Sequence, residues 1–190
     1  MKTQNSTYHI KTDMILAEQI EIDLAKKDLS KFSVLYERYY LQIFKFIYQR
    51  VETELQAAEI CSDVFIKVME NLKTYKTSEI PFASWLYRIA RNTIYTNYKQ
   101  GKKFRQVNFS SNDLINLTEE TYEEQLDKLG IVVEALKKLS HEETELIEMK
   151  YFEKRTYFEI SNIMGITENN AKIKTFRVIQ KLKQLTKLAL

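Results

Sequence analysis

Apolar residues recur at intervals of three and four along most of this chain, which is the spacing of one face of an α-helix. Residues that interrupt helices are scarce, because the 190 residues include only three Gly and one Pro. No sustained run of alternating β-branched residues is present to predict a sheet. With 44% hydrophobic residues, the chain has enough apolar material for packed cores. The sequence therefore predicts an all-α protein.

The helical periodicity breaks down between about residues 104 and 121, where Ser, Asn, Thr and acidic residues replace the apolar pattern. Residues 106–127 contain six acids and no base. Such a composition is typical of a flexible connection rather than a packed helix. We predict two small helical domains, residues 13–104 and 129–187, joined by a flexible acidic linker, residues 105–128.

The most distinctive segment of the first domain is residues 85–103, WLYRIARNTIYTNYKQGKK. On a helix its apolar residues gather on one side, and the other side collects cations, aromatic rings and an amide. Cations suit phosphate oxygens and rings suit stacked bases, so this side is typical of a platform for single-stranded nucleic acid. A basic surface that only faces water is the alternative. The side chains of this platform are Arg88, Arg91, Asn92, Tyr95, Tyr98, Lys99 and Lys102.

Two further apolar stripes predict helices ahead of this segment. The first comprises Phe32, Leu35, Tyr36, Tyr39, Ile43 and Phe46, and the second comprises Ile60, Val64, Val68 and Leu72. Opposite the second stripe, Glu59 and Asp63 share one face. A paired-carboxylate or metal site is one interpretation, but the nearby sequence offers no histidine or third acid to complete it, so we favour an acidic face for a partner. The single cysteine, Cys61, lies within the apolar pattern and predicts a buried thiol.

Helix boundaries are well marked in the second domain. Ser140 with Glu143, and Thr156 with Glu159, are capping boxes that predict two helix starts, and Gly165 predicts the end of the second helix. A helix, a short turn containing Gly and a following basic helix predict a helix-turn-helix. The alternative is that these two helices only pack against each other as a helical hairpin and do not bind DNA. The last helix exposes Asn169, Asn170, Lys172, Lys174, Arg177 and Lys181.

Enzymatic and membrane functions find little support in the residues. The chain has two histidines, one cysteine and no Gly-rich phosphate loop, so we expect no catalytic set, no cofactor and no metal. No apolar run approaches the roughly 20 residues needed to span a bilayer, and the start MKTQNSTYHIK lacks the apolar middle of a secretory signal. We expect a cytoplasmic protein with no direct membrane insertion.

Taken together, these segments resemble the extracytoplasmic-function (ECF) group of bacterial sigma factors in the sigma-70 family, over residues 13–185. The family's second conserved region resembles FSVLYERYY, AAEICSDVF and FASWLYRIARN, and its fourth resembles LKKLSHEETELIEMKYFEKRTYFEISNIMGITENNAKIKTFRVIQKL. The resemblance implies a protein that binds core RNA polymerase, recognises two elements of promoter DNA and helps open the duplex. A sigma-like mimic that sequesters an anti-sigma protein is the alternative, although a decoy has no need of Asn92 and Arg177.

The resemblance also implies roles for individual residues. The helix that contains Glu59, Asp63, Phe65 and Lys67 corresponds to the segment that docks on core polymerase. Asn92 and the loop of residues 73–82 correspond to a pocket that captures a flipped minus-ten base. The expected minus-ten contacts are Tyr75, Arg88, Arg91, Asn92, Tyr95 and Lys99. The expected minus-thirty-five contacts are Asn169, Asn170, Lys172, Lys174, Arg177 and Lys181. An anti-sigma factor is a further partner that the resemblance leaves open.

Overall fold

The computed structural model describes residues 12–76, 80–99 and 122–187, and within these ranges it contains helices and turns but no strand. The all-α prediction is therefore confirmed. The described residues form two compact units, one within residues 12–99 and the other within residues 122–187. In the described ranges no helix is both long and apolar enough to cross a membrane, and no group of three His, Cys, Asp or Glu side chains is placed to hold a metal ion.

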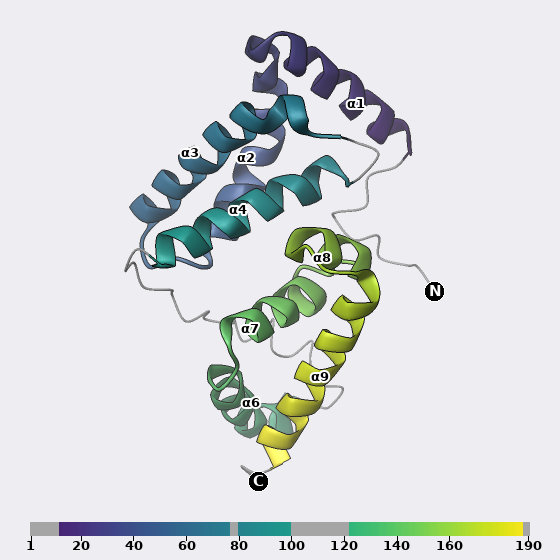
Figure 1. Ribbon diagram of the computed structural model, residues 1–190. Coiled ribbons are helices and arrows are strands. Elements are labelled where there is room, and N and C mark those ends of the chain that lie inside the picture. The colour runs from purple at the N-terminus through teal and green to yellow at the C-terminus, as the bar shows by residue number, and fades with distance from the viewer. Residues whose placement is uncertain (1–11, 77–79, 100–121, 188–190) are drawn as a thin grey trace. The chain divides into compact units, whose positions relative to one another are not determined.

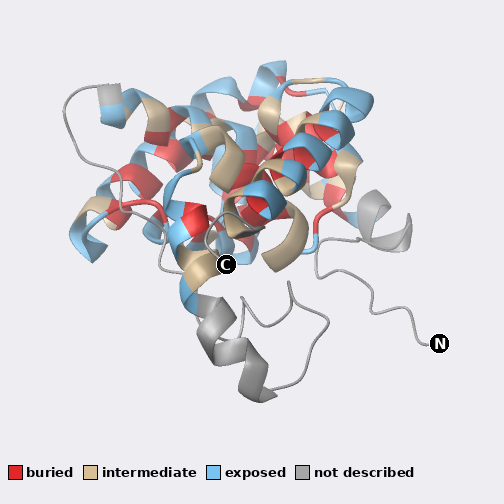
Figure 2. Ribbon diagram, turned by 90° about the horizontal axis from the view of Figure 1, so that it is seen from below, coloured by how far each residue is buried: buried red, intermediate tan, exposed pale blue. Residues whose placement is uncertain are grey.

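The described residues of the first unit form four helices and two short 3-10 turns. The helices are α1 Thr12–Lys27, α2 Ser33–Tyr48, α3 Glu54–Asn71 and α4 Phe82–Lys99, and the turns are Leu29–Phe32 and Leu72–Thr74. Helices α2, α3 and α4 contact one another in every pairing, and α1 contacts α2 (Figure 1). In Figure 2, buried and exposed residues alternate along the described helices. The core of this unit therefore lies where α2, α3 and α4 meet.

Most of the predicted core positions in this unit are buried. The stripe of α3 is buried throughout, with Ile60, Val64, Val68 and Leu72 at 1% exposure or less. In α2 the prediction is wrong for Tyr36, which is 40% exposed because its ring lies at the edge of the core, 4.7 Å from the Phe65 ring. Cys61 is fully buried, as predicted, and burial raises the pKa of its thiol to about 11. The thiol therefore stays protonated and unreactive near neutral pH.

The second unit is arranged around its last helix. Its elements are α6 Tyr122–Lys137, α7 His141–Ile147, a π-helical turn Glu148–Phe152, α8 Tyr157–Met164 and α9 Glu168–Lys187. Helix α9 contacts α6, α7 and α8, so the other helices of the unit all pack against it (Figure 1). Helix α6 begins within the residues that the sequence analysis assigned to the linker.

Local hydrogen bonds determine where these helices begin and end. Both predicted capping boxes form, Ser140 with Glu143 and Thr156 with Glu159. Gly165 ends α8 in the left-handed conformation at φ 70°, which a residue without a Cβ adopts at little cost. The Thr167 hydroxyl oxygen accepts the backbone N–H of Asn170 at 3.2 Å and caps α9. The turn between α8 and α9 is therefore specified by its own sequence.

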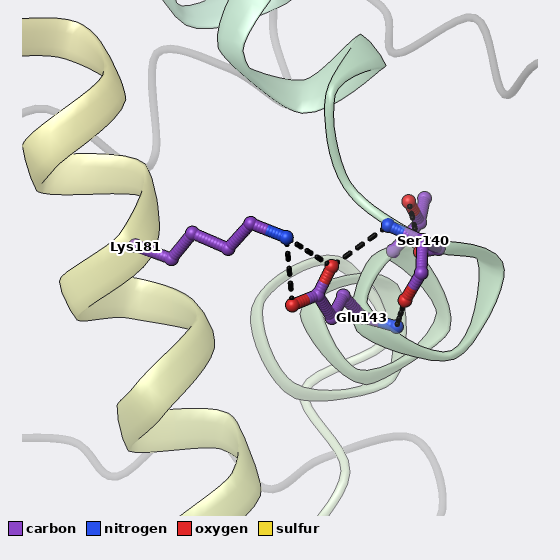
Figure 3. A network of polar contacts seen from close by, with 4 residues as sticks. Ser140, Glu143 and Lys181 are labelled. Carbon is purple, nitrogen blue, oxygen red and sulfur yellow. Dashed lines mark hydrogen bonds and ion pairs between the residues drawn. The ribbon is translucent and has the colours of Figure 1, made fainter.

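Glu143 joins the start of α7 to α9 (Figure 3). Its carboxylate accepts the Ser140 backbone N–H at 2.7 Å and the Lys181 ammonium at 2.7 and 3.0 Å. Burial by itself raises the pKa of Glu143, but the hydrogen bonds from Lys181 and Ser140 outweigh it and hold the pKa below its usual range. A second lysine of α9, Lys174, pairs with Glu142. Two ion pairs therefore fix α9 against the first turn of α7.

The turn before α8 contains a residue in an unfavourable backbone conformation. Lys154 has φ 56°, in the left-handed region that suits Gly. The next residue, Arg155, is 1% exposed, its guanidinium Nε pairs with Glu153, and its backbone N–H donates to the Met149 carbonyl at 2.8 Å. These contacts fix the chain on one side of Lys154, so the turn keeps this conformation despite its cost.

We expect Lys154→Gly to raise the midpoint of thermal unfolding of the second unit. The left-handed conformation costs a non-glycine residue about 1–2 kcal/mol, and the greater freedom of Gly in the unfolded chain offsets roughly 0.5–1 kcal/mol of that relief. The net gain is between roughly zero and about 1.5 kcal/mol, measured by circular dichroism of the full chain. As a control, Lys137→Gly in the last turn of α6 should lower the midpoint. A lower midpoint for Lys154→Gly would contradict the proposed strain.

We expect Glu143→Gln to flatten the acid side of the stability profile. Because the folded-state pKa is lowered, ionised Glu143 adds stability above the ordinary glutamate pKa of about 4.3, and this stability is lost as pH falls through the folded value. The variant should unfold at lower urea concentration at neutral pH and lose less stability on acidification than the wild type. The control is Glu134→Gln, since Glu134 is 64% exposed and pairs only along its own helix. Parallel profiles for Glu143→Gln and wild type would refute this role.

Candidate nucleic-acid interfaces

Helix α4 carries the first candidate interface, because its two sides are chemically opposed. The inner side buries Phe82, Leu86, Tyr87, Ala90 and Ile94, each at 3% exposure or less. The outer side exposes Arg88, Asn92 and Tyr98. Lys99 is the last residue of α4 and Lys102 follows it, and the side chains of both lie outside the described residues. The inner contacts fix the rotation of the helix, and with it the direction in which Arg88 and Asn92 point.

A pocket of about 370 Å³ opens between α3 and α4 beside Asn92. Its walls combine apolar side chains, amides and cations, chiefly Trp85 and Ile89, Asn71 and Asn92, and Lys67 and Arg88. An indole ring offers a stacking face, an amide can bond the edge of a base, and a cation can meet a phosphate. This combination is suited to a single unstacked nucleotide.

Lys67 forms one side of this pocket instead of facing away from α4. Its ammonium donates to the hydroxyl of Thr93 at 3.2 Å, and Thr93 is 2% exposed. The bond joins α3 to α4 within the lining of the pocket, to which both residues belong. The sequence analysis expected Lys67 on the polymerase-docking side, and its position in the fold instead ties it to the α4 interface. Periodicity could not reveal this, because a long side chain at the border of a helix face can turn either way.

Tyr75 supports the pocket from the core side and does not lie on the surface. It is 3% exposed, its ring lies 4.9 Å from the Trp85 ring and 5.3 Å from the Phe82 ring, and its hydroxyl donates to the Ile80 carbonyl at 2.8 Å. Lys26 donates to the Tyr75 carbonyl at 2.8 Å. A direct contact between this ring and a base, as expected from the sequence, is incompatible with its burial. Tyr75 instead holds Trp85 in position.

Arg91 and Tyr95 form a pair on α4. The Arg91 guanidinium carbon lies 4.7 Å from the centre of the Tyr95 ring, within the range of a cation–π contact. Both side chains are half-exposed. The pair keeps a positive charge beside an aromatic ring, which is the combination that the sequence analysis associated with single strands.

The outer face of α3 is a second kind of surface. Glu59 and Asp63 are exposed, as a docking face requires, whereas Phe65 is 2% exposed and belongs to the core. Sequence reasoning missed two exposed apolar residues on this face, Leu55 at 71% and Ile66 at 50%. Both lie outside the buried stripe of the helix. An apolar residue off that stripe is expected to be exposed, and this position in the sequence could have identified both residues as surface residues.

Helices α8 and α9 form the predicted helix-turn-helix. Asn169, Asn170, Lys172 and Arg177 are exposed on α9, and no ion pair among the described residues holds Lys172 or Arg177. Lys174 and Lys181, which the sequence analysis grouped with them, instead pair with Glu142 and Glu143 of α7. These two lysines stabilise the packing of the unit, because they lie on the flank of α9 that faces α7.

Two family models match the chain. Sigma-70 region 2 matches residues 35–104, and Sigma-70, region 4 matches residues 135–184. The first match contains α3 and α4, with the pocket between them. The second contains α7, α8 and the outer face of α9.

Several curated proteins are similar in sequence. The ECF RNA polymerase sigma factor BldN of Streptomyces coelicolor is 23% identical, over 81% of this chain and 60% of that protein. The RNA polymerase sigma factor YlaC of Bacillus subtilis is 26% identical, over 69% and 78%. The ECF RNA polymerase sigma factor SigM of Bacillus subtilis is 23% identical, over 80% and 92%. The chain thus spans about three fifths of the length of BldN and larger shares of the other two.

Two solved structures share the fold. CnrH, solved in complex with the cytosolic domain of CnrY, superposes with a TM-score of 0.62 at 18% identity, over 90% of this chain and 98% of that one. The sigma factor RpoE from Bartonella quintana, solved with the anti-sigma factor NepR, superposes with a TM-score of 0.55 at 17% identity, over 82% and 96%.

Proposed function

Because the chain belongs to the sigma-70 family, we propose that it acts as an RNA polymerase sigma factor of the ECF type, directing core polymerase to specific promoters and helping to open the DNA. The observation that carries this proposal is the presence of regions 2 and 4 in order, each with a cationic helix face directed away from its own core. We assign residues 13–104 to region 2, residues 105–128 to the linker and residues 129–187 to region 4. The protein would work in the cytoplasm with the polymerase and without catalysis of its own.

In region 2, the pocket beside Asn92 would hold a base that has left the duplex. Taking a base out of the stack costs a few kcal/mol, which contacts made only to the unpaired base must offset. The amide of Asn92 can bond the base edge, Trp85 supplies an apolar wall, and Arg88 can meet the adjoining phosphate. Arg91, Tyr95 and Lys99 would follow the strand along α4. These contacts favour the open promoter over the closed one.

In region 4, α9 would read the upstream promoter element as the second helix of a helix-turn-helix. Asn169 and Asn170 lie at its start, where base edges are usually contacted, and Lys172 and Arg177 are exposed along it. Lys174 and Lys181 would act through their ion pairs to α7, by fixing the angle at which α9 is presented.

The outer face of α3 would dock on core polymerase. It combines the acidic Glu59 and Asp63 with the exposed apolar Leu55 and Ile66. A small apolar surface bordered by charges is typical of a protein interface. The similar RpoE was solved with the anti-sigma factor NepR, and such a factor would be a further partner of this chain.

Run-off transcription tests the proposal as a whole. Purified core polymerase with the full chain should transcribe a subset of genomic promoter fragments that core polymerase alone does not transcribe. A sigma mimic would bind an anti-sigma protein but give no transcript. Core binding without any promoter-dependent product would therefore overturn the proposed function.

We expect Asn92→Ala to impair promoter opening selectively. The variant should bind core polymerase and form closed complexes, but lose roughly 1–3 kcal/mol of stabilisation of the open state, which is the value of one polar contact to a base. Permanganate reactivity of the minus-ten region and run-off product should both fall. A template with a pre-melted minus-ten bubble should largely restore the variant, because the cost of unpairing has been removed.

Asn97→Ala is the matched control for this experiment. Asn97 lies on the same helix, but its amide donates to the Thr93 carbonyl at 3.1 Å and it does not line the pocket. This variant should open the duplex promoter normally. If Asn92→Ala failed equally on duplex and bubble templates, the flipped-base role of Asn92 would be wrong.

We expect Arg177→Ala to weaken promoter binding by the holoenzyme. If Arg177 meets a phosphate, the log–log dependence of affinity on salt should become shallower by about 0.9. If it reads a base, discrimination at one position of the upstream element should fall by roughly 1–3 kcal/mol. Unchanged affinity at all salt concentrations would remove Arg177 from the interface.

A further inference from the structure

Two apolar side chains occupy the middle of the exposed side of α9. Phe176 is 63% exposed and Ile173 is 41% exposed. The opposite side of the helix is marked by the buried residues Ala171, Thr175, Val178 and Leu182. On the side of α9 that faces away from these buried residues, four residues form a line with spacings of four, three and four. They are Asn169, Ile173, Phe176 and Gln180. Ile173 and Phe176 therefore point directly away from the core of the unit.

Cations border this line on both sides. At 100° per residue, Lys172 lies on one side of it and Arg177 on the other. Lys174 and Lys181 lie farther round towards α7 and are held there by its glutamates. The exposed side of α9 is consequently uncharged along its middle and positive along its edges.

This distribution of charge matches a major groove. The walls of the groove are phosphates, which attract the cations at the edges of the helix, while the floor consists of base edges. A helix that lies in the groove presents its outermost line to the floor. Among the groups exposed there, the C5 methyl of thymine is the apolar one. Water is a poor environment for Ile173 and Phe176, and contact with thymine methyl groups would remove apolar surface from water on both sides.

We propose that Ile173 and Phe176 are specificity-determining residues that read thymine methyl groups in the upstream promoter element. The proposal rests on the function proposed above and adds to it the feature of the DNA that α9 selects. Phe176 carries the larger part, because it is the more exposed of the two and has the larger apolar surface.

The test removes the methyl group from the DNA and the ring from the protein. Holoenzyme assembled from the full chain and core polymerase binds a promoter fragment that it transcribes, in which each thymine of the upstream element is replaced in turn by deoxyuridine. At one or two positions the wild type should bind about fourfold more weakly, the value of one buried methyl group. At those positions Phe176→Ala or Ile173→Ala should bind thymine and uracil with equal affinity.

Phe158→Ala is the matched control. Phe158 is also exposed, at 49%, but it lies on α8 and outside the line along α9. This variant should keep the full preference of the wild type for thymine. The scan with the unaltered protein needs no variant, so it remains decisive if a substitution disturbs folding.

Two results would overturn the inference. One is a wild-type holoenzyme that binds every uracil-containing fragment as tightly as the thymine fragment. The other is a Phe176→Ala and Ile173→Ala pair that retains the full thymine preference, which would assign the apolar residues to a protein partner instead. Both presuppose a transcribing holoenzyme, whereas failure to transcribe any fragment would reject the proposed function itself.

Discussion

The packing of α4 against α2 and α3 is the contact on which the first unit depends, because one 18-residue helix supplies both core and interface. Leu86 and Ala90 are fully buried, and Arg88 and Asn92 emerge between and after them on the other side. A rotation of the helix would bury cations and expose apolar residues together, at a cost of several kcal/mol. Packing of the core therefore fixes the direction in which the exposed side chains of α4 point. Lys67 strengthens that arrangement, because its ammonium bonds to Thr93 and joins α3 to α4.

In the second unit, two lysines of α9 are paired within the protein and others are not. Lys174 and Lys181 are partly neutralised by Glu142 and Glu143, and Glu143 also caps α7. The side of α9 towards α7 therefore carries little net charge, and the positive potential of the helix is concentrated on its outward side. Charge that is already paired within a protein contributes little to attracting a phosphate backbone. The same residues that fix the angle of α9 would thus also restrict the surface that it offers to DNA in the proposed function.

Sequence periodicity was sufficient to predict most of this architecture. The stripes of α3 and α4, the two capping boxes and the stop at Gly165 are all local signals, and each formed as expected. The contacts that could not be predicted are those between side chains of different elements. Tyr75 is in a connection without periodicity, so nothing in the sequence indicated that its ring would pack beneath Trp85. The ion pairs of Lys174 and Lys181 likewise join residues more than thirty positions apart.

Each unit has only a modest set of contacts for DNA, and their nature makes the two units depend on one another. In the function proposed above, the pocket beside Asn92 would hold an unpaired base, so it would add nothing to binding of a closed duplex. On the outward side of α9, ion pairs within the described residues leave Lys172, Arg177 and Lys183 available, which is a small number of possible phosphate contacts. Neither surface alone accounts for tight binding. In the proposed holoenzyme, engagement of α9 would raise the effective concentration of α4 at the minus-ten region, and the favourable free energy of the flipped base would then become part of the total.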